Sequence, residues 1–213
     1  MTDFWAAEND WYQHAPVERL AKALAQYDVY KSILHLPGDV VEFGTFKGAS
    51  LVRLATYREV LESAQARRIY GFDTFGVMPA GEGESDADVA RRFGDQGDCL
   101  SLVDTEALLR GKGFENVELV AGDILSTLPS LLDERPALRF ALVNVDVLLK
   151  PVTAAVLDLC ASRLVPGGVM MLDDYAKAAG ATEAAEEFLS SHRDYELRRS
   201  PLSYQPALLV RAG

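Results

Sequence analysis

Short apolar runs alternate with longer segments of helical periodicity along most of this 213-residue chain. The apolar runs cover residues 39–43, 69–72, 117–120, 140–145 and 169–172. Because the last three runs are nearly all apolar, we interpret the runs as strands covered on both faces, as in a mainly parallel sheet. Alternation of such strands with helices is typical of the α/β class. The length is sufficient for one sizeable core, so we expect a single domain over residues 1–213.

The segments between and after these runs complete the expected fold. Their periodicity predicts helices over residues 17–36, 49–64, 124–132, 152–164 and 183–192, and strands over 195–199 and 207–211. Pro166, Gly167 and Gly168 should stop the helix over 152–164 just beyond its end. The sequence therefore predicts a mainly parallel, seven-stranded sheet with helices on both faces, preceded by a helical extension over about residues 1–36.

Charge and cysteine usage limit the partners and the compartment. Acidic side chains outnumber basic ones by 32 to 21, and the resulting formal charge of −11 argues against a nucleic acid substrate. No apolar run approaches membrane-spanning length, and the first residues lack the basic and apolar segments of a signal peptide. Cys99 and Cys160 show no metal-ligand spacing and are too few for a disulfide scaffold. We expect a cytoplasmic protein without a membrane partner.

The turn after the first expected strand carries an acid and two glycines, in Glu42-Phe43-Gly44-Thr45-Phe46-Lys47-Gly48. The glycines permit a tight turn and a close approach of the backbone to a ligand at a helix N-terminus. A dinucleotide-binding turn follows G-x-G-x-x-G, whereas here Glu42 precedes the first glycine. A carboxylate at this position favours a cationic cofactor with an amino group and a sulfonium over a pyrophosphate. The alternative is a solvated Glu42 beside a structural turn.

Two further acids follow the second and third expected strands. Asp73 lies where doubly wound folds bind the hydroxyls of a ribose. Asp123 is positioned for an adenine amino group or, alternatively, for capping the next helix. Ligands of open α/β sheets bind at the carboxyl ends of the strands, where Glu42, Asp73 and Asp123 all fall. Together the three acids predict an adenosyl cofactor with a cationic end.

The fourth and fifth expected strands also end in acids, namely Asp146, Asp173 and Asp174. Three carboxylates facing one crevice would bind Mg²⁺ through oxygen, with water or substrate oxygens completing the octahedron. Such an ion would stabilise an alkoxide and orient it toward a sulfonium methyl group. The alternative is that Asp173 and Asp174 cap a loop while Asp146 is solvated. The three histidines show no triad or ligand spacing, and we assign them no role.

Two segments lie outside the alternating pattern. Residues 76–97 are rich in glycine and acid, and we expect either a lid over the substrate or a surface excursion. The N-terminal region is rich in aromatic residues, which would cover the active site, form a subunit interface or complete the core. These residues are Trp5, Trp11, Tyr12, Tyr27 and Tyr30. On this basis we expect a homodimer.

The motifs at these positions resemble those of the macrocin O-methyltransferase family, whose relatives include the mycinamicin and novobiocin sugar O-methyltransferases. The resemblance runs from about residue 20 to 188 and rests on residues 36–50 (LPGDVVEFGTFKGAS), 71–75 (GFDTF) and 167–175 (GGVMMLDDY). It implies a Rossmann-like class I methyltransferase fold that binds S-adenosylmethionine. It also implies Mg²⁺-assisted methylation of a sugar hydroxyl on a small-molecule glycoside, such as a glycosylated natural product, or on a polysaccharide precursor.

The residues and the resemblance together define a set of expected site residues. Those expected to bind the cofactor are Glu42, Gly44, Thr45, Phe46, Lys47, Gly48, Ser50, Asp73, Thr74, Gly122 and Asp123. Those expected to bind the metal are Asp146, Asp173 and Asp174, with Asp146 also the expected catalytic residue.

One segment departs from the family pattern, which after the fourth strand is Asp-x-Asp-Leu-Tyr-Glu-Pro. Here residues 144–151 read Asn-Val-Asp-Val-Leu-Leu-Lys-Pro. If one residue is inserted, Asp146 is the metal ligand and Asn144 replaces the first acid. If one is deleted, Asp146 matches the first acid and the ligand is lost. We favour the insertion, because it keeps an acid at the site. The alternative functions are metal-independent chemistry on the same fold and a non-catalytic, cofactor-binding partner subunit.

Overall fold

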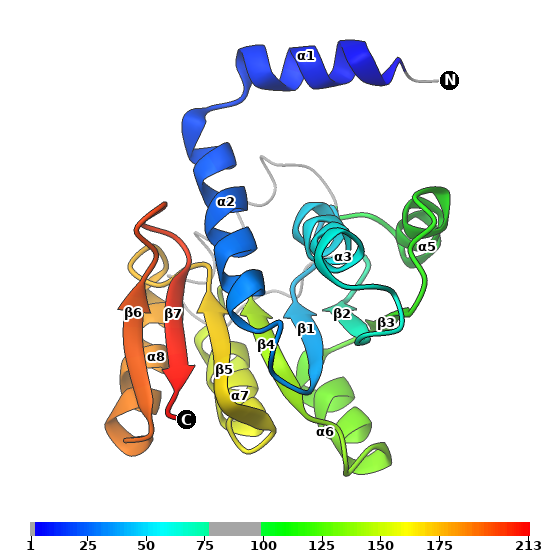
Figure 1. Ribbon diagram of the computed structural model, residues 1–213. Helices are drawn as coiled ribbons and strands as arrows, with labels where there is room; N and C mark the ends of the chain where they lie inside the picture. Colours follow the sequence, from blue (N-terminus) through cyan, green and yellow to red (C-terminus); the bar gives the residue numbers. More distant parts are fainter. Residues whose placement is uncertain (1–2, 77–98) are drawn as a thin grey trace.

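A seven-stranded sheet forms the centre of the computed structural model, which describes residues 3–76 and 99–213 (Figure 1). The strands are β1 (Asp39–Phe43), β2 (Ile69–Asp73), β3 (Val117–Ala121), β4 (Phe140–Val145), β5 (Leu164–Leu172), β6 (Tyr195–Arg199) and β7 (Ala207–Arg211). Their order across the sheet is β3-β2-β1-β4-β5-β7-β6. Strands β1 to β5 are parallel, and β7 is antiparallel to both of its neighbours. The predicted α/β class and mainly parallel seven-stranded sheet are confirmed.

Strand β5 begins at Leu164, five residues before the predicted start at residue 169. The prediction that Pro166, Gly167 and Gly168 follow a helix end is wrong, because these residues lie within β5 and the preceding helix already ends at Ala161. The pairing with β4 is irregular here, since Phe140 pairs with Leu164 whereas Leu142 pairs with Val169. Proline and glycine are tolerated where a strand bulges out of the regular ladder.

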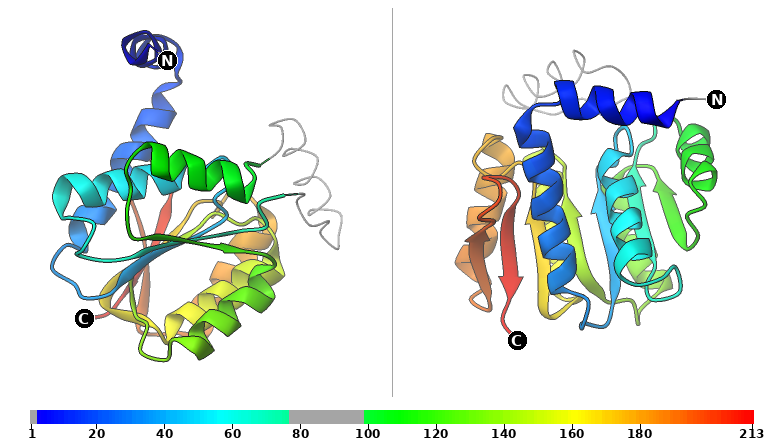
Figure 2. Two further views of the ribbon diagram at one scale, coloured as in Figure 1. Left: turned by 90° about the vertical axis from the view of Figure 1, so that its right-hand side faces the viewer. Right: turned by 45° about the horizontal axis from the view of Figure 1, so that its top comes forward.

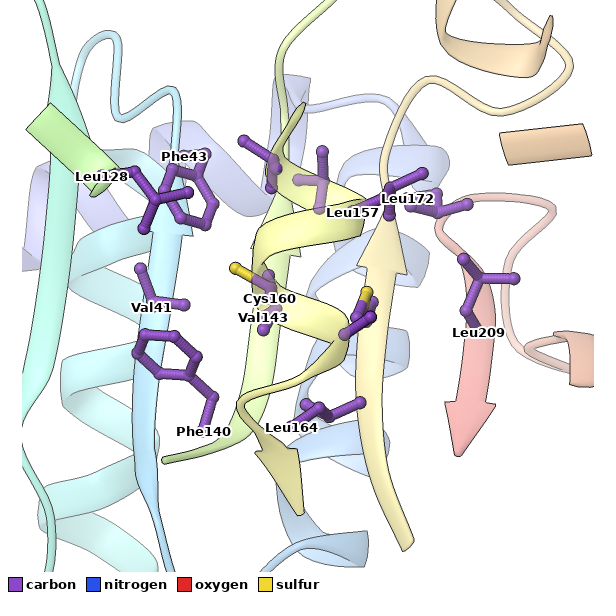
Figure 3. Packing of buried hydrophobic residues seen from close by; sticks show 14 of the residues in the cluster. Val41, Phe43, Leu128, Phe140, Val143, Leu157, Cys160, Leu164, Leu172 and Leu209 are labelled. Atoms are coloured by element: carbon purple, nitrogen blue, oxygen red, sulfur yellow. The ribbon is translucent and has the colours of Figure 1, made fainter. Parts of the chain in front are cut away.

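Helices cover both faces of the sheet (Figure 2). They are α1 (Phe4–His14), α2 (Val17–Ser32), α3 (Ala49–Leu61), α5 (Leu102–Gly111), α6 (Ile124–Glu134), α7 (Lys150–Ala161) and α8 (Ala179–Ser191). On one face α6, α7 and α8 enclose a core that includes Val41, Phe43 and the fully buried Cys160 (Figure 3). On the other face α2, α3 and α5 pack over Val40 and Leu142. Side chains alternate along β1, so Glu42 lies on the same face as Val40.

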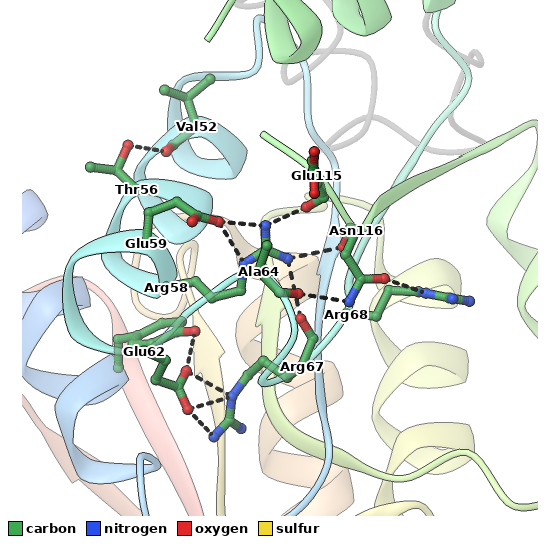
Figure 4. A network of polar contacts seen from close by, with 11 residues as sticks. Val52, Thr56, Arg58, Glu59, Glu62, Ala64, Arg67, Arg68, Glu115 and Asn116 are labelled. Atoms are coloured by element: carbon green, nitrogen blue, oxygen red, sulfur yellow. Dashed lines mark hydrogen bonds and ion pairs between the residues drawn. The ribbon is translucent and has the colours of Figure 1, made fainter. Parts of the chain in front are cut away.

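A buried arginine ties the end of α3 to the strands beside it (Figure 4). Arg58 is fully buried and donates hydrogen bonds to the backbone oxygens of Arg67 (3.1 Å), Asn116 (2.9 Å) and Glu115. These acceptors precede β2 and β3, and the Asn116 oxygen also accepts from the Ile69 backbone N–H at 3.1 Å, so Arg58 binds where the two strands begin to pair. This network fixes α3, and with it the turn that precedes α3.

The N-terminal region, expected as a helical extension over about residues 1–36 with a helix over 17–36, forms two helices, and the second ends at Ser32. Asp3 caps α1 by accepting hydrogen bonds from two backbone N–H groups, and Pro16 separates α1 from α2. Helix α1 buries none of its residues and projects away from the sheet (Figures 1 and 2), whereas α2 buries Val29 and Tyr30 in the core. Of the aromatic residues in this region, Tyr30 therefore completes the core, and Trp5, Trp11 and Tyr12 are exposed.

Two further expectations concern the rest of the chain. The lid predicted over residues 76–97 lies almost wholly outside the described residues. Among the helices that the structure describes, none is long and apolar enough to cross a membrane.

Candidate active site

The turn between β1 and α3 packs directly against the segment that follows β4. Gly44 has a φ of +88°, and a Cβ atom added to it would lie 2.1 Å from the backbone oxygen of Asp146. The Asp146 backbone N–H donates to the Phe43 oxygen at 2.9 Å, which holds the two segments together. Gly48, with a φ of +74°, stands at the N-cap of α3. The close approach that Gly44 permits is therefore to the Asp146 backbone, and its role toward a cofactor stays a prediction.

Glu42 is fully buried beneath this turn. Its Oε1 accepts a 2.8 Å hydrogen bond from the Asn144 side-chain amide, while its Oε2 has no partner among the described residues. Burial raises the pKa of Glu42 to about 7, against the opposing effects of the Ser50 hydroxyl and the Asn144 amide. The interpretation of Glu42 as a solvated surface acid is therefore wrong. A buried carboxylate oxygen without a donor suits a ligand that supplies a positively charged donor.

Asp73 is buried at the end of β2 and organises two adjacent loops. Its Oδ2 accepts hydrogen bonds from the Phe46 backbone N–H at 2.8 Å and the Thr45 hydroxyl at 3.4 Å. Its Oδ1 accepts from the Phe75 backbone N–H at 3.0 Å and the Thr74 hydroxyl at 3.4 Å. Asp73 therefore holds the β1–α3 turn in place, and its predicted role toward a ribose stays a prediction.

Asp123 is exposed and forms the N-cap of α6, where its Oδ1 accepts from the Leu125 backbone N–H at 3.0 Å. The capping interpretation is thus confirmed. The backbone N–H of the preceding residue, Gly122, donates to the backbone oxygen of Asp73 at 2.9 Å, which keeps the ends of β2 and β3 together. Binding of an adenine group by Asp123 stays a prediction.

A cavity of about 460 Å³ opens at the carboxyl ends of β1, β4 and β5. Its lining residues are Arg19, Lys22, Gly44, Thr45, Phe46, Lys47, Ala49, Ser50, Arg53, Asp146, Leu148, Asp173, Asp174 and Lys177. The cavity brings together the predicted metal ligands and much of the predicted cofactor turn. No histidine lines it, and six of the predicted cofactor residues do not: Glu42, Gly48, Asp73, Thr74, Gly122 and Asp123.

Three carboxylates converge on one side of this cavity. Asp146 follows β4, whereas Asp173 and Asp174 follow β5, and one oxygen from each lies within 4.8 Å of the others. Asp173 Oδ1 and Asp174 Oδ2 are buried and have no hydrogen-bond partner among the described residues. A cluster of carboxylate oxygens with unsatisfied acceptors fits a hard divalent cation. Asp146 thus lies beside Asp173 and Asp174, as the insertion requires, and its role as a metal ligand stays a prediction. Asn144, two residues earlier on β4, pairs with Glu42.

Two lysines that the sequence analysis missed neutralise part of this cluster. Lys22 Nζ from α2 lies 2.6 Å from Asp173 Oδ2 and 3.8 Å from Asp146 Oδ2. Lys177 Nζ lies 3.4 Å from Asp174 Oδ1. Burial and the neighbouring Asp173 carboxylate raise the pKa of Asp146 well above its ordinary value, and Lys22 opposes this shift. The spacing of Lys177 three residues after Asp174 was visible in the sequence, whereas nothing in the sequence places Lys22 at the site.

The fold, and the position of the cavity at the carboxyl ends of the strands, are those of the class I methyltransferases. The solved calicheamicin methyltransferase CalS11 superimposes with a TM-score of 0.72 at 26% identity, over 95% of this chain and 83% of its own. A second structure of CalS11 is described as a TDP-rhamnose 3'-O-methyltransferase and is 28% identical over 95% of this chain and 84% of its own, with a TM-score of 0.70. The O-methyltransferase NovP gives a TM-score of 0.75 at 19% identity, over 89% of this chain and 80% of its own.

The chain belongs to the macrocin-O-methyltransferase (TylF) family, whose model matches residues 17–197. A curated relative from Streptomyces olivaceus, the 8-demethyl-8-(2,3-dimethoxy-alpha-L-rhamnosyl)-tetracenomycin-C 4'-O-methyltransferase, is 32% identical over 148 residues. The match covers 66% of this chain and 54% of the relative, so the chain spans about half the length of that protein. The resemblance to this family that the motifs indicated is confirmed.

Proposed function

We propose that the chain is an S-adenosylmethionine-dependent O-methyltransferase that methylates a sugar hydroxyl. Membership of the macrocin-O-methyltransferase family supports the reaction. The curated relative acts on a rhamnosylated natural product and CalS11 is named for an activated rhamnose, which supports a sugar of a glycosylated natural product or saccharide precursor as the acceptor. The convergence of Asp146, Asp173 and Asp174 beside the β1–α3 turn is the structural observation that carries the proposal.

The residues around the turn fit the methionine end of this cofactor. Glu42 offers a buried carboxylate oxygen without a partner, which suits the α-amino group of the cofactor. The cavity next to Glu42 is lined by Thr45, Phe46 and Ser50. Asp73 holds this turn in place by accepting a hydrogen bond from the Phe46 backbone N–H. When bound, the cofactor supplies an electrophilic methyl group on a sulfonium. We propose Asp73 and Asp123 as the groups toward its ribose and adenine.

The three aspartates fit Mg²⁺ as the group that prepares the acceptor. When bound, the ion would supply Lewis-acid stabilisation to an acceptor hydroxyl as that hydroxyl loses its proton. Asp146 is the proposed catalytic residue, because 26% of its side chain is exposed while Asp173 and Asp174 are buried. Lys22 and Lys177 limit the repulsion among the three carboxylates and hold them in place. No histidine lines the cavity, so the aspartates are the available acceptors for the hydroxyl proton among the described lining residues.

Transfer of a labelled methyl group tests the proposal. Purified protein is incubated with Mg²⁺, labelled S-adenosylmethionine and a panel of rhamnosides and activated rhamnose, with and without a chelator. We expect labelled sugar product that disappears with the chelator and with Asp146→Asn. The exposed Asp158 of α7 provides a matched control, since Asp158→Asn should leave transfer unchanged. Transfer that is insensitive to the chelator would exclude the metal mechanism.

A second candidate function is that of a cofactor-binding protein with metal-independent chemistry, or of a non-catalytic partner subunit. The 2.6 Å contact between Lys22 and Asp173 favours it, because an ammonium group already neutralises part of the cluster. Calorimetry separates the candidates. Binding of S-adenosylmethionine with neither Mg²⁺ binding nor turnover would support the partner subunit, and binding with turnover but without Mg²⁺ would support metal-independent chemistry.

A further inference from the structure

The cavity is rich in basic side chains although the chain as a whole carries a formal charge of −11. Five basic and three acidic residues line it. Lys22 and Lys177 face the aspartates of the cluster. Arg19 and Arg53, in contrast, make no hydrogen bond or ion pair within residues 3–76 and 99–213. Two guanidinium groups in the cavity are therefore left without a counterion from the described part of the protein.

Arg19 and Arg53 come from neighbouring helices. Arg19 lies in the first turn of α2 and is exposed, and Arg53 lies in the second turn of α3 and is half-buried. Helices α2 and α3 pack against each other, so both side chains reach the same cavity. An arginine pair on two packed helices gives a rigid, cationic side of the cavity beside the carboxylate cluster.

The surroundings of Arg53 show that this arrangement lacks a compensating anion. Its Nε is buried without an acceptor among the described residues. Burial lowers the pKa of Arg53 and the charge of Arg19 lowers it further, while Tyr57, Glu42 and Asp173 oppose the shift without a hydrogen bond to the guanidinium. Placing like charges together and burying an unpaired donor both cost free energy. A bound anion would remove both costs.

We infer that the sugar acceptor carries a phosphate or diphosphate group, and that Arg19 and Arg53 bind its oxygens. This inference rests on the proposed function and assigns a substrate class to it. A guanidinium group can bind two phosphate oxygens at once, and two guanidinium groups match the charge of a diphosphate better than a neutral glycoside. The anion would lie against α2 and α3, which directs the sugar toward the neighbouring aspartate cluster. The acceptor is then an activated sugar, methylated before its transfer to another molecule.

Binding of thymidine diphosphate and of inorganic pyrophosphate, measured by calorimetry without added metal, tests the anion site. We expect both to bind the wild-type protein, and Arg19→Gln and Arg53→Gln each to bind them about tenfold more weakly, since a charge-assisted hydrogen bond is lost. Arg193→Gln is the matched control, because Arg193 is exposed, lies just before the edge strand β6 and does not line the cavity. Equal affinities in all four proteins would overturn the inference.

The same variants are titrated with S-adenosylhomocysteine to separate the acceptor from the cofactor. We expect Arg19→Gln to bind it as the wild type does. Parallel losses of S-adenosylhomocysteine and thymidine diphosphate binding in both variants would assign the arginines to the cofactor and overturn the inference. Urea unfolding curves of each variant identify any loss of fold, and the exposed Arg19 provides a variant that should retain it.

Methyl transfer then distinguishes the inference from the proposed function. TDP-rhamnose, rhamnose 1-phosphate and methyl rhamnoside are compared as acceptors, and the two phosphorylated sugars also separate a diphosphate from a monophosphate site. We expect kcat/KM for a phosphorylated sugar to exceed that for the methyl rhamnoside at least tenfold, and Arg19→Gln to lower it mainly through KM. Equal transfer to the neutral sugar would overturn the inference and leave the proposed function intact. Arginine-dependent thymidine diphosphate binding without any transfer would support the anion site and count against the proposed function.

Discussion

Replacing Gly44 with alanine should disrupt the contact that joins the cofactor turn to Asp146. The backbone φ of +88° is unfavourable for alanine, which costs roughly 1–2 kcal/mol. The added Cβ would also lie 2.1 Å from the Asp146 backbone oxygen, so one of the two segments must move by about 1 Å. Overlaps of this kind cost roughly 1–3 kcal/mol, and we expect a total loss of roughly 2–5 kcal/mol in the free energy of unfolding.

Urea unfolding measures this loss, with Gly48→Ala as the matched control. Gly48 also has a positive φ, of +74°, but the nearest atom to its added Cβ is a Leu108 methyl at 3.4 Å. Gly48→Ala should therefore cost only the backbone strain of roughly 1–2 kcal/mol. The displaced Asp146 should in addition weaken Mg²⁺ binding in Gly44→Ala more than in Gly48→Ala. Equal free energies of unfolding for the two variants would refute the packing of Gly44 on Asp146.

Three further predictions concern buried charges. The pKa of Glu42 is raised to about 7 from an ordinary value of 4.5, so between these pH values the unfolded chain has lost a proton that the folded chain keeps. The free energy of unfolding should therefore fall by about 3 kcal/mol as pH rises through this range, and urea unfolding of Glu42→Gln should show a smaller fall. The same dependence of the unfolding free energy on pH in both proteins would contradict the raised pKa of Glu42. Arg58→Lys should lower the melting temperature by roughly 2–4 °C in calorimetry, the shift for a loss of about 1 kcal/mol in a chain of this length, because a single ammonium nitrogen does not reach the separate carbonyl groups that the guanidinium reaches from two nitrogens. An unchanged melting temperature would count against the network. Lys22→Met should tighten Mg²⁺ binding roughly tenfold in a calorimetric titration, because it removes a cation that competes with Mg²⁺ for Asp173. Lys31→Met is the control, since Lys31 is exposed, and should leave the affinity unchanged. Weaker Mg²⁺ binding by Lys22→Met would contradict the competition.

Strands β2 and β4 were predictable because each is a nearly continuous apolar run, but three features of the fold differ from the prediction. Helix α1 falls within the helical extension expected over about residues 1–36, but its separate bounds were not predicted, and its aromatic residues are exposed. Helix α5 was missed although Ser101 and Asp104 form a capping pair at its start, with Ser101 Oγ accepting from the Asp104 N–H at 3.1 Å. The start of β5 was hidden by Pro166 and the following glycines, which a regular strand disfavours and an irregular pairing with β4 accommodates.

The acids of the candidate site were predictable because they follow strands directly in the sequence. The carboxyl ends of parallel strands meet at one edge, so Glu42, Asp146 and Asp173 had to lie near one another. The basic residues were not predictable in this way. Lys22 is 151 residues from Asp173 in the sequence and reaches it because α2 packs on the face of the sheet that includes β5. Such positions depend on helix packing, which leaves no local pattern in the sequence.

Calorimetric titration of Mg²⁺ into the protein saturated with S-adenosylhomocysteine tests most directly whether Asp146 completes a cation site with Asp173 and Asp174. We predict a single ion per chain for the wild type and for the control Asp158→Asn, and at least roughly tenfold weaker binding for Asp146→Asn, because a charged ligand of the ion is lost. Absence of Mg²⁺ binding to the wild type, or the same affinity in Asp146→Asn, would contradict the account.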